Sequence, residues 1–178
     1  MAVLNELEPK EVFRFFEEIS AIPRGSRDTK RISDYLMAFA KERDLKVIQD
    51  EVNNVIIFQP GTPGYEESEP VILQGHMDMV CESNDKSFDF ENNPITTIVD
   101  GEWLHADGTT LGADNGIGIA GALAAFTDEK LVHGPMEALF TVDEETGLTG
   151  AYNLGDDMIH GSILLNLDSE DDAQIFVG

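Results

Sequence analysis

The apolar positions of the first 60 residues change from a helical to a strand spacing. Residues 9–22 place Val12, Phe15, Phe16 and Ile19 at the three-to-four-residue interval of one helix face. A second helix should follow, with an apolar face made by Ile32, Tyr35, Leu36 and Phe39. Ser26 or Asp28 is the expected N-cap of that helix, because both residue types accept bonds from free N–H groups.

Later apolar runs predict strands that alternate with helices. Strands are expected at 46–49, 55–59, 136–142 and 163–167, and in the run that ends at His76. Asp100-Gly101 predicts a hairpin between 95–99 and 102–105. A small-residue helix from about 117 to 128 and a short helix over 146–154 complete the pattern. Such alternation is typical of an α/β domain, and residues 174–178 read as a strand that is cut short.

Composition narrows the class of protein. The chain has 178 residues, of which 42% are hydrophobic and 26% charged, enough for one domain with a real core. Its formal net charge of −24 disfavours nucleic acid and membrane surfaces as partners. Most of the acids are expected on a solvated surface, and only a few are candidates for binding divalent cations.

Cys81 is the only cysteine, so no internal disulfide can form. We interpret it as a small core residue. The N-terminus lacks a basic segment followed by a long apolar run, so we predict no signal peptide and a cytoplasmic protein.

The chemistry-bearing residues share a placement. His76, Asp78, Glu144, Glu145 and Asp168 all follow apolar strands, where ligands gather in open α/β sheets. Asp114 lies in a glycine-rich turn before a helix. One histidine with several carboxylates suits zinc, manganese or cobalt. Of the adjacent pair Glu144 and Glu145, one can bind a metal while the other takes a proton from water.

Each of these residues also has a plain structural explanation. Taken alone, His76 reads better as a core histidine, and Asp114 equally well as a helix N-cap. Glu144-Glu145 fits the acidic first turn of a helix, and Asp168 fits a loop. Their joint occurrence after successive strands favours a metal site. The remaining aromatic and histidine side chains are expected to be core (Trp103, Phe13, Phe15, Phe16) or structural and surface residues (His105, His133, His160).

Two other functions remain open at this stage. Gly116–Gly121 matches the spacing of a dinucleotide-binding turn, with Asp143 at a suitable distance, which would indicate an oxidoreductase domain. The turn does not follow a buried strand directly, and Asp114 would face the pyrophosphate, so we interpret these glycines as packing positions. A non-catalytic acidic α/β module is the third possibility.

Four segments resemble the aminoacyl-histidine dipeptidases, also called Xaa-His dipeptidases or peptidase D. These enzymes belong to the co-catalytic zinc peptidases that include aminoacylase and carnosinase. The resemblance runs in order along the chain, through Gly75-His-Met-Asp-Met-Val80, Gly108-Thr-Thr-Leu-Gly-Ala-Asp-Asn-Gly116, Glu144-Glu145-Thr-Gly147 and Asn166-Leu-Asp-Ser-Glu170.

The resemblance implies a role for each matching residue. His76 and Asp168 would bind one metal, Asp114 would bridge two metals, and Glu145 would bind the second. Asp78 would orient His76, and Glu144 would be the general base. The implied cofactor is two divalent metal ions, most readily zinc, with cobalt and manganese as alternatives.

The resemblance also implies an architecture and a substrate. The expected fold is a three-layer α/β catalytic domain, with helices on both faces of a mixed β-sheet, incomplete in this chain. Residues 1–178 would be its N-terminal part. A lid and dimerisation domain, and the rest of the catalytic domain with a further histidine ligand, would lie outside this sequence. The expected parent is a homodimer that hydrolyses Xaa-His dipeptides, and the 178-residue piece alone is expected to be inactive.

Overall fold

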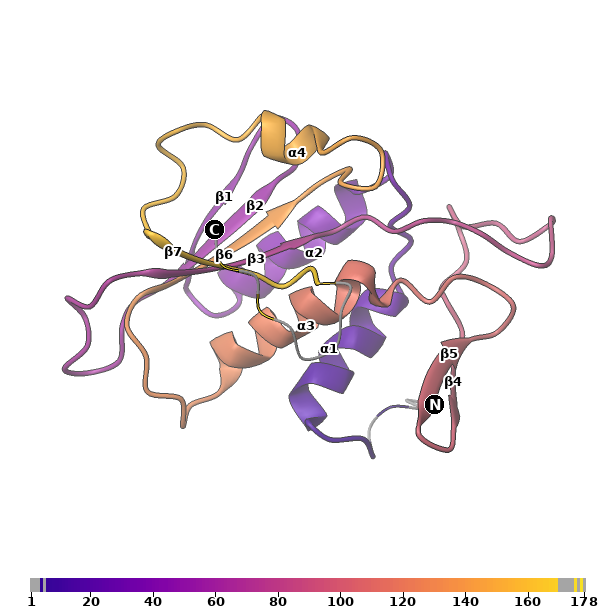
Figure 1. Cartoon of the computed structure of the whole chain (residues 1–178), viewed down its shortest axis with the longest axis horizontal. Coiled ribbons are helices and arrows are strands. Elements are labelled where there is room, and N and C mark those ends of the chain that lie inside the picture. The colour runs from indigo at the N-terminus through magenta and orange to yellow at the C-terminus, as the bar shows by residue number, and fades with distance from the viewer. Residues whose placement is uncertain (1–3, 5, 170–174, 176, 178) are drawn as a thin grey trace.

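The computed structural model describes residues 4, 6–169, 175 and 177 (Figure 1). In chain order the described helices and strands are α1 (Lys10–Ser20), α2 (Lys30–Lys41), β1 (Lys46–Gln49), β2 (Val55–Gln59), β3 (Val71–His76), β4 (Thr97–Asp100), β5 (Trp103–Ala106), α3 (Ala113–Thr127), β6 (Met136–Thr141), α4 (Thr149–Tyr152) and β7 (Ile163–Asn166).

Five of these strands form a mixed sheet in the order β1-β2-β6-β3-β7. β2 runs antiparallel to both β1 and β6, whereas β3 runs parallel to β6 and to β7. The register places His76, the last residue of β3, beside Thr141, the last residue of β6. The carboxyl ends of β3, β6 and β7 therefore meet at one edge of the sheet.

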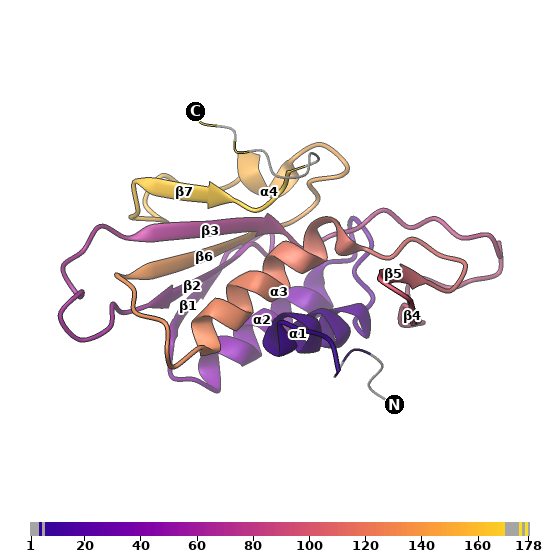
Figure 2. The same ribbon diagram turned by 60° about the horizontal axis from the view of Figure 1, so that its bottom comes forward.

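Helices α1, α2 and α3 cover one face of the sheet (Figure 2). The main core lies there and is fully buried at Phe15, Ile19, Leu36, Val55 and Leu123, among others. Because side chains alternate along a strand, the neighbouring positions Ile56, Ile72 and Leu139 point to the opposite face. That face is covered by Leu154, Met158 and Ile159 and by the four-residue helix α4. The expected mixed sheet with helices on both faces is confirmed, with a thin second layer.

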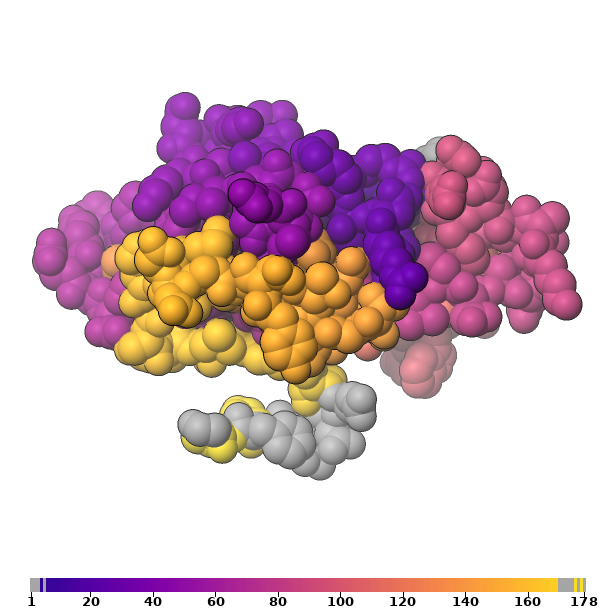
Figure 3. Space-filling view, turned by 90° about the horizontal axis from the view of Figure 1, so that it is seen from above, coloured from indigo at the N-terminus to yellow at the C-terminus, as the bar shows by residue number. Residues whose placement is uncertain are grey.

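β4 and β5 form a separate two-stranded hairpin at the end of the molecule where β3 finishes (Figure 1). In the space-filling view the segment that contains them projects beyond the sheet and its helices (Figure 3). Trp103, at the tip of this hairpin, is 78% exposed. The prediction that Trp103 is a core residue is wrong, because the hairpin carries it away from the core.

Two other local predictions were wrong. α2 is preceded by Thr29, which makes no side-chain cap bond, while Ser26 and Asp28 bond to Asp78 and Arg31 instead. Cys81 is exposed, because it lies in the loop that leaves the sheet after β3. Among the predicted core aromatics, Phe15 and Phe16 are buried and Phe13 is partly buried.

Two of the predicted helices have clearly different bounds in the structure. The helix expected to begin near residue 117 begins at Ala113, and the helix expected over 146–154 is reduced to α4. The prediction for residues 174–178 falls mostly outside the described residues. None of the helices that the structure describes is long and apolar enough to cross a membrane.

Candidate metal centre

Three segments bring acidic side chains to His76 at the carboxyl edge of the sheet. β3 ends at His76, the turn after β6 carries Glu144 and Glu145, and Asp168 follows β7. Asp114 lies in the first turn of α3, where its backbone φ of −80° and ψ of 113° depart from helical values. Gly112, with φ of 72°, precedes that turn, and a left-handed backbone of this kind suits glycine. Asp114 is therefore held beside His76 and does not cap the helix.

The ring of His76 is the centre of this arrangement. Its side chain is 1% exposed, and its Nε2 atom faces carboxylate oxygens at 2.9 Å in Asp114, 3.8 Å in Asp168 and 3.9 Å in Glu144. Nδ1 lies 3.1 Å from the backbone oxygen of Asp78 and 3.3 Å from its carboxylate. Both of those oxygens can only accept, so Nδ1 donates to Asp78 and the ring is oriented with Nε2 towards the acidic cluster, where a cation would replace the Nε2 proton.

His76, Asp114 and Glu145 offer ligand atoms that all lie within 4.8 Å of one another. Asp168 adds a fourth donor residue on the same side of the imidazole ring. One nitrogen and several carboxylate oxygens at this spacing fit a divalent cation such as zinc.

Asp78 ties the histidine to the acidic turn after β6. Its carboxylate is fully buried and accepts hydrogen bonds from the backbone N–H groups of Glu144 at 3.0 Å and Glu145 at 3.3 Å. The hydroxyl of Ser26 donates to the same carboxylate at 2.7 Å. Burial alone would raise the pKa of Asp78, but the bonds from His76, Ser26 and Glu144 outweigh it and lower the pKa.

The electrostatics of the cluster favour the binding of a cation. Burial raises the pKa of the carboxyl groups of Glu144, Glu145 and Asp168, and repulsion from neighbouring acids adds to the effect. Burial would lower the pKa of His76, but the bonds to Asp78 and Asp114 and the charge of Asp168 raise it to about 9. A bound divalent cation would relieve this repulsion, so the residues present fit such an ion.

Sequence reasoning missed three residues that support the site: Ser26, Arg24 and Asn115. The guanidinium of Arg24 is buried beneath the cluster, and burial lowers its pKa to about 10. Asn115 donates from Nδ2 to the backbone oxygen of Leu167 at 2.7 Å, so it joins the start of α3 to the segment that carries Asp168. Serine, arginine and asparagine are not usual zinc ligands, and no spacing rule marks these three positions.

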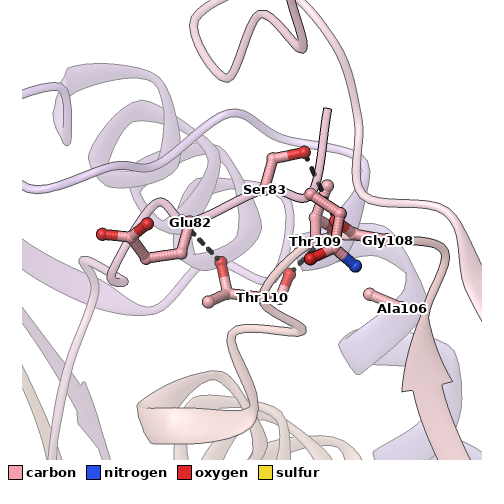
Figure 4. Close-up of a pocket in the computed structure, with 7 residues that line it drawn as sticks. Glu82, Ser83, Ala106, Gly108, Thr109 and Thr110 are labelled. Atoms are coloured by element: carbon pink, nitrogen blue, oxygen red, sulfur yellow. Dashed lines mark hydrogen bonds between the residues drawn. The ribbon is translucent and has the colours of Figure 1, made fainter. Parts of the chain in front are cut away.

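A pocket of about 370 Å³ lies nearby, between the loop after β3 and the segment after β5 (Figure 4). The hydroxyl of Thr110 accepts from the N–H of Glu82 at 3.3 Å and donates to the oxygen of Val80 at 2.6 Å. Ser83 donates to the oxygen of Gly108 at 3.3 Å. These bonds fix the segment that leads to Asp114, while the pocket itself contains none of the clustered acids.

The dinucleotide-binding interpretation is not supported by the position of Gly116–Gly121. The strand before α3 is β5, which belongs to the separate hairpin and not to the central sheet. Gly116 and Gly118 are buried in the first half of α3, and Gly118 packs against Asn115 and Leu167. The three other histidines lie apart from the cluster. His160, for example, pairs with Glu137 at 3.2 Å.

Residues 72–176 match the peptidase family M20/M25/M40. The chain belongs to this family. Along its whole length it is 44% identical to the cytosol non-specific dipeptidase of Escherichia coli strain K12. It is also 29% identical, over 79% of its length, to the uncharacterized protein YqjE of Bacillus subtilis strain 168.

One solved structure supports the same family relationship, and a second shows the same fold. The chain superposes on the aminoacylhistidine dipeptidase of Vibrio alginolyticus with a TM-score of 0.92 and 44% identity over 95% of its residues. Its fold is also that of aminopeptidase PepT from Bacillus cereus, with a TM-score of 0.77 over 91% of the chain at 24% identity. The chain spans 37% of the E. coli relative, 35% of the Vibrio chain and 44% of the PepT chain. The expected resemblance to the dipeptidase branch of the M20 peptidases is confirmed.

Proposed function

We propose that this chain supplies the metal centre of a dipeptidase that hydrolyses peptide bonds with a metal-activated water. The observation that carries the proposal is the convergence of His76, Asp114 and Glu145, whose ligand atoms lie within 4.8 Å of one another around a buried imidazole. The names of the E. coli and Vibrio relatives support a dipeptidase.

The proposed cation-binding roles are those that the resemblance to the dipeptidases implies for the matching residues. His76 and Asp168 would hold one ion, Asp114 would bridge to a second ion, and Glu145 would bind that second ion. The donor set favours zinc, with cobalt and manganese as alternatives. When bound, such ions polarise a carbonyl group and lower the pKa of water towards neutrality.

Glu144 is the proposed general base. Its carboxylate faces the Nε2 side of the His76 ring, 3.9 Å from that nitrogen. Its side chain is 32% exposed, so it can contact both water and substrate. Burial raises the pKa of Glu144 and so brings it closer to neutral pH. A pKa near the working pH suits a group that takes a proton from water and then gives it to the leaving amine. Asp78 has no exposed surface and acts as a positioning residue for His76 and for the Glu144-Glu145 turn.

The finer assignments come from the named relatives. We propose Xaa-His dipeptides as substrates and the cytoplasm as the location, because the chain is similar to an aminoacylhistidine dipeptidase and to a cytosol dipeptidase. We also propose that residues 1–178 act as the N-terminal part of a catalytic domain. In that arrangement a lid domain would make the homodimer, and the additional length of the relatives would complete the second metal site.

Cation binding tests the proposal directly. Calorimetric titration with Zn²⁺ or Co²⁺ should show binding to the wild-type chain and a loss of roughly tenfold or more in Asp114→Asn. Asp156→Asn, an exposed acid in the loop before β7, is the matched control and should bind as wild type does. Equal affinity in all three proteins would contradict the site.

The role of Glu144 needs a separate test. Glu144→Gln should keep the cation affinity of the wild type, because Glu144 is not a proposed ligand. In a chain of the relatives' full length, the same substitution should reduce hydrolysis of a Xaa-His dipeptide by roughly a hundredfold or more. Retained hydrolysis would show that another group takes the proton.

A further inference from the structure

Arg24 is a buried cation that no carboxylate in the described part of the chain neutralises at ion-pair distance. It lies between α1 and α2 and is 1% exposed. Its guanidinium donates to three backbone oxygens instead: Nη1 to Met77 at 3.0 Å and to Asp78 at 3.2 Å, and Nη2 to Gly112. Nε has no hydrogen-bond partner among the described residues. Since an unneutralised buried charge is costly, this arrangement calls for a specific explanation.

The three oxygens belong to the two segments that carry the clustered residues. Met77 and Asp78 directly follow His76 at the end of β3, and Gly112 precedes Asp114 by two residues. The backbone reinforces the first of these contacts, because the N–H of Met79 donates to the oxygen of Arg24 at 3.1 Å. One planar group therefore fixes the end of β3 relative to the first turn of α3, and so His76 relative to Asp114.

Two glycines, Gly112 and Gly116, leave the space that the guanidinium of Arg24 occupies, and a side chain at either position would collide with it. A Cβ atom added at Gly112 would lie 2.5 Å from Arg24 Nη2, and one added at Gly116 would lie 2.6 Å from it. Gly116 is in α3, where alanine would otherwise be the better helix former. Close approach to the guanidinium accounts for a glycine at this helical position.

We propose that Arg24 is a positioning residue that sets the separation and orientation of His76 and Asp114 for cation binding. This inference rests on the proposed metal centre. A lysine would keep the positive charge, but its single ammonium lacks the planar fork that reaches oxygens on two segments. Charge alone is therefore not expected to replace it.

Two substitutions and two controls test the proposal in the full 178-residue chain. Arg24→Lys removes the fork, and Gly116→Ala displaces the guanidinium without changing Arg24 itself. Arg14→Lys is the control for the first, because Arg14 pairs with Glu11 and Glu18 on the surface of α1. Gly121→Ala is the control for the second, because a Cβ at Gly121 in the same helix meets nothing within 4 Å.

Two measurements are made on each protein. Co²⁺ affinity and the absorption spectrum of bound Co²⁺ report the geometry of the cation site. The ¹⁵N ring signals of the four histidines, recorded without any cation, report the surroundings of His76 directly. We expect Arg24→Lys and Gly116→Ala to weaken Co²⁺ binding roughly tenfold or more, to change the cobalt spectrum, and to shift the His76 ring signals alone. Both controls should match wild type.

The outcomes separate this inference from the proposed function. Unchanged His76 signals and unchanged Co²⁺ binding in a folded Arg24→Lys or Gly116→Ala protein would overturn the role of Arg24 and leave the cation site standing. If wild type binds no Co²⁺, the cation site fails, and a shift of the His76 signals in the variants would still support Arg24 as the group that positions this ring. A loss of stability with unshifted His76 signals would show that Arg24 only supports the fold, and would overturn the inference.

Discussion

Asp78 is the most constrained acid of the site, because its carboxylate is fully buried and has four hydrogen-bond partners. It accepts from the His76 ring, the hydroxyl of Ser26 and the N–H groups of Glu144 and Glu145. Asp78→Asn keeps the shape but places an NH₂ group opposite donors. We expect a loss of about 3 kcal/mol in the free energy of unfolding, measured by urea denaturation at pH 7.

The control for this substitution is Ser26→Ala, which removes one donor and leaves the buried charge otherwise paired. It should cost about 1 kcal/mol. The sign of the pH dependence follows from the lowered pKa of Asp78: its stabilisation is present above the unfolded pKa of about 3.9 and is lost as the pH falls through the lower folded value. An Asp78→Asn protein as stable as wild type at pH 7 would show that this hydrogen-bond network is not needed for the fold.

His76 gives a second prediction at the scale of one residue. Without a cation its folded pKa is about 9, above the unfolded value of about 6.5. The stabilisation from the proton is therefore complete below about pH 6.5 and is lost as the pH rises through 9. A cation that binds Nε2 must displace this proton, so binding near pH 7 should release about one proton from His76.

Calorimetric titrations of Zn²⁺ in buffers of different ionisation enthalpy measure this release. The number of protons should fall towards zero, and the apparent affinity should rise, as the pH is raised beyond 9. Binding heats that are independent of the buffer near pH 7 would show that His76 is already neutral in the cation-free protein.

Strand β3 depends on a glycine for its contact with α3. A Cβ at Gly75 would lie 2.3 Å from Asn115 Oδ1, and Asn115 cannot move away because its Nδ2 bonds to the oxygen of Leu167. Gly75→Ala should therefore lower the free energy of unfolding by about 1–3 kcal/mol. Thermal and urea unfolding measure the loss, and Gly121→Ala, which meets no neighbour, should be neutral or slightly stabilising. A neutral Gly75→Ala would mean that Asn115 is free to shift.

At the scale of elements, sequence periodicity predicted most of the fold. The runs at 46–49 and 55–59 match β1 and β2 residue for residue. The small-residue helix was placed late, beginning at 117, because Asp114 and Asn115 break helical geometry inside its first turn. Local pattern cannot reveal such a break, since it is stabilised by contacts with β3 and β7.

The sequence predicted the clustered acids but not the residues that hold them in place, Arg24 and Ser26. Residues that follow strands could be assigned to one edge of the sheet from topology alone. Arg24 and Ser26 follow no strand of the sheet, and they reach the site only because the segment between α1 and α2 runs beside the end of β3. The exposure of Trp103 was missed for a related reason, because a hairpin signal does not say whether the hairpin packs on the sheet or stands away from it.

At the scale of the whole molecule, the proposed ligands are spread from His76 to Asp168 over β3, α3, the turn after β6 and the segment after β7. Cation binding by these residues joins the elements in the folded state, and the unfolded chain offers no such site. By mass action it should therefore raise the unfolding temperature. At a free cation concentration of 100 Kd the gain in the free energy of unfolding is about 2.7 kcal/mol. Differential scanning calorimetry with and without Zn²⁺ measures the shift.

Because the net charge is −24, ions can also stabilise the protein by screening its surface acids. This screening must be separated from binding at the cation site. Any salt screens the repulsion among surface acids and should raise the unfolding temperature somewhat. Sodium chloride at matched ionic strength measures this general screening, and Asp114→Asn in the presence of Zn²⁺ measures what remains when the site is damaged. The specific site predicts that Zn²⁺ stabilises wild type well beyond sodium chloride, and that Asp114→Asn loses most of this excess while responding normally to sodium chloride. An equal response of both proteins to Zn²⁺ would show that the cation acts on the acidic surface as a whole and not at His76.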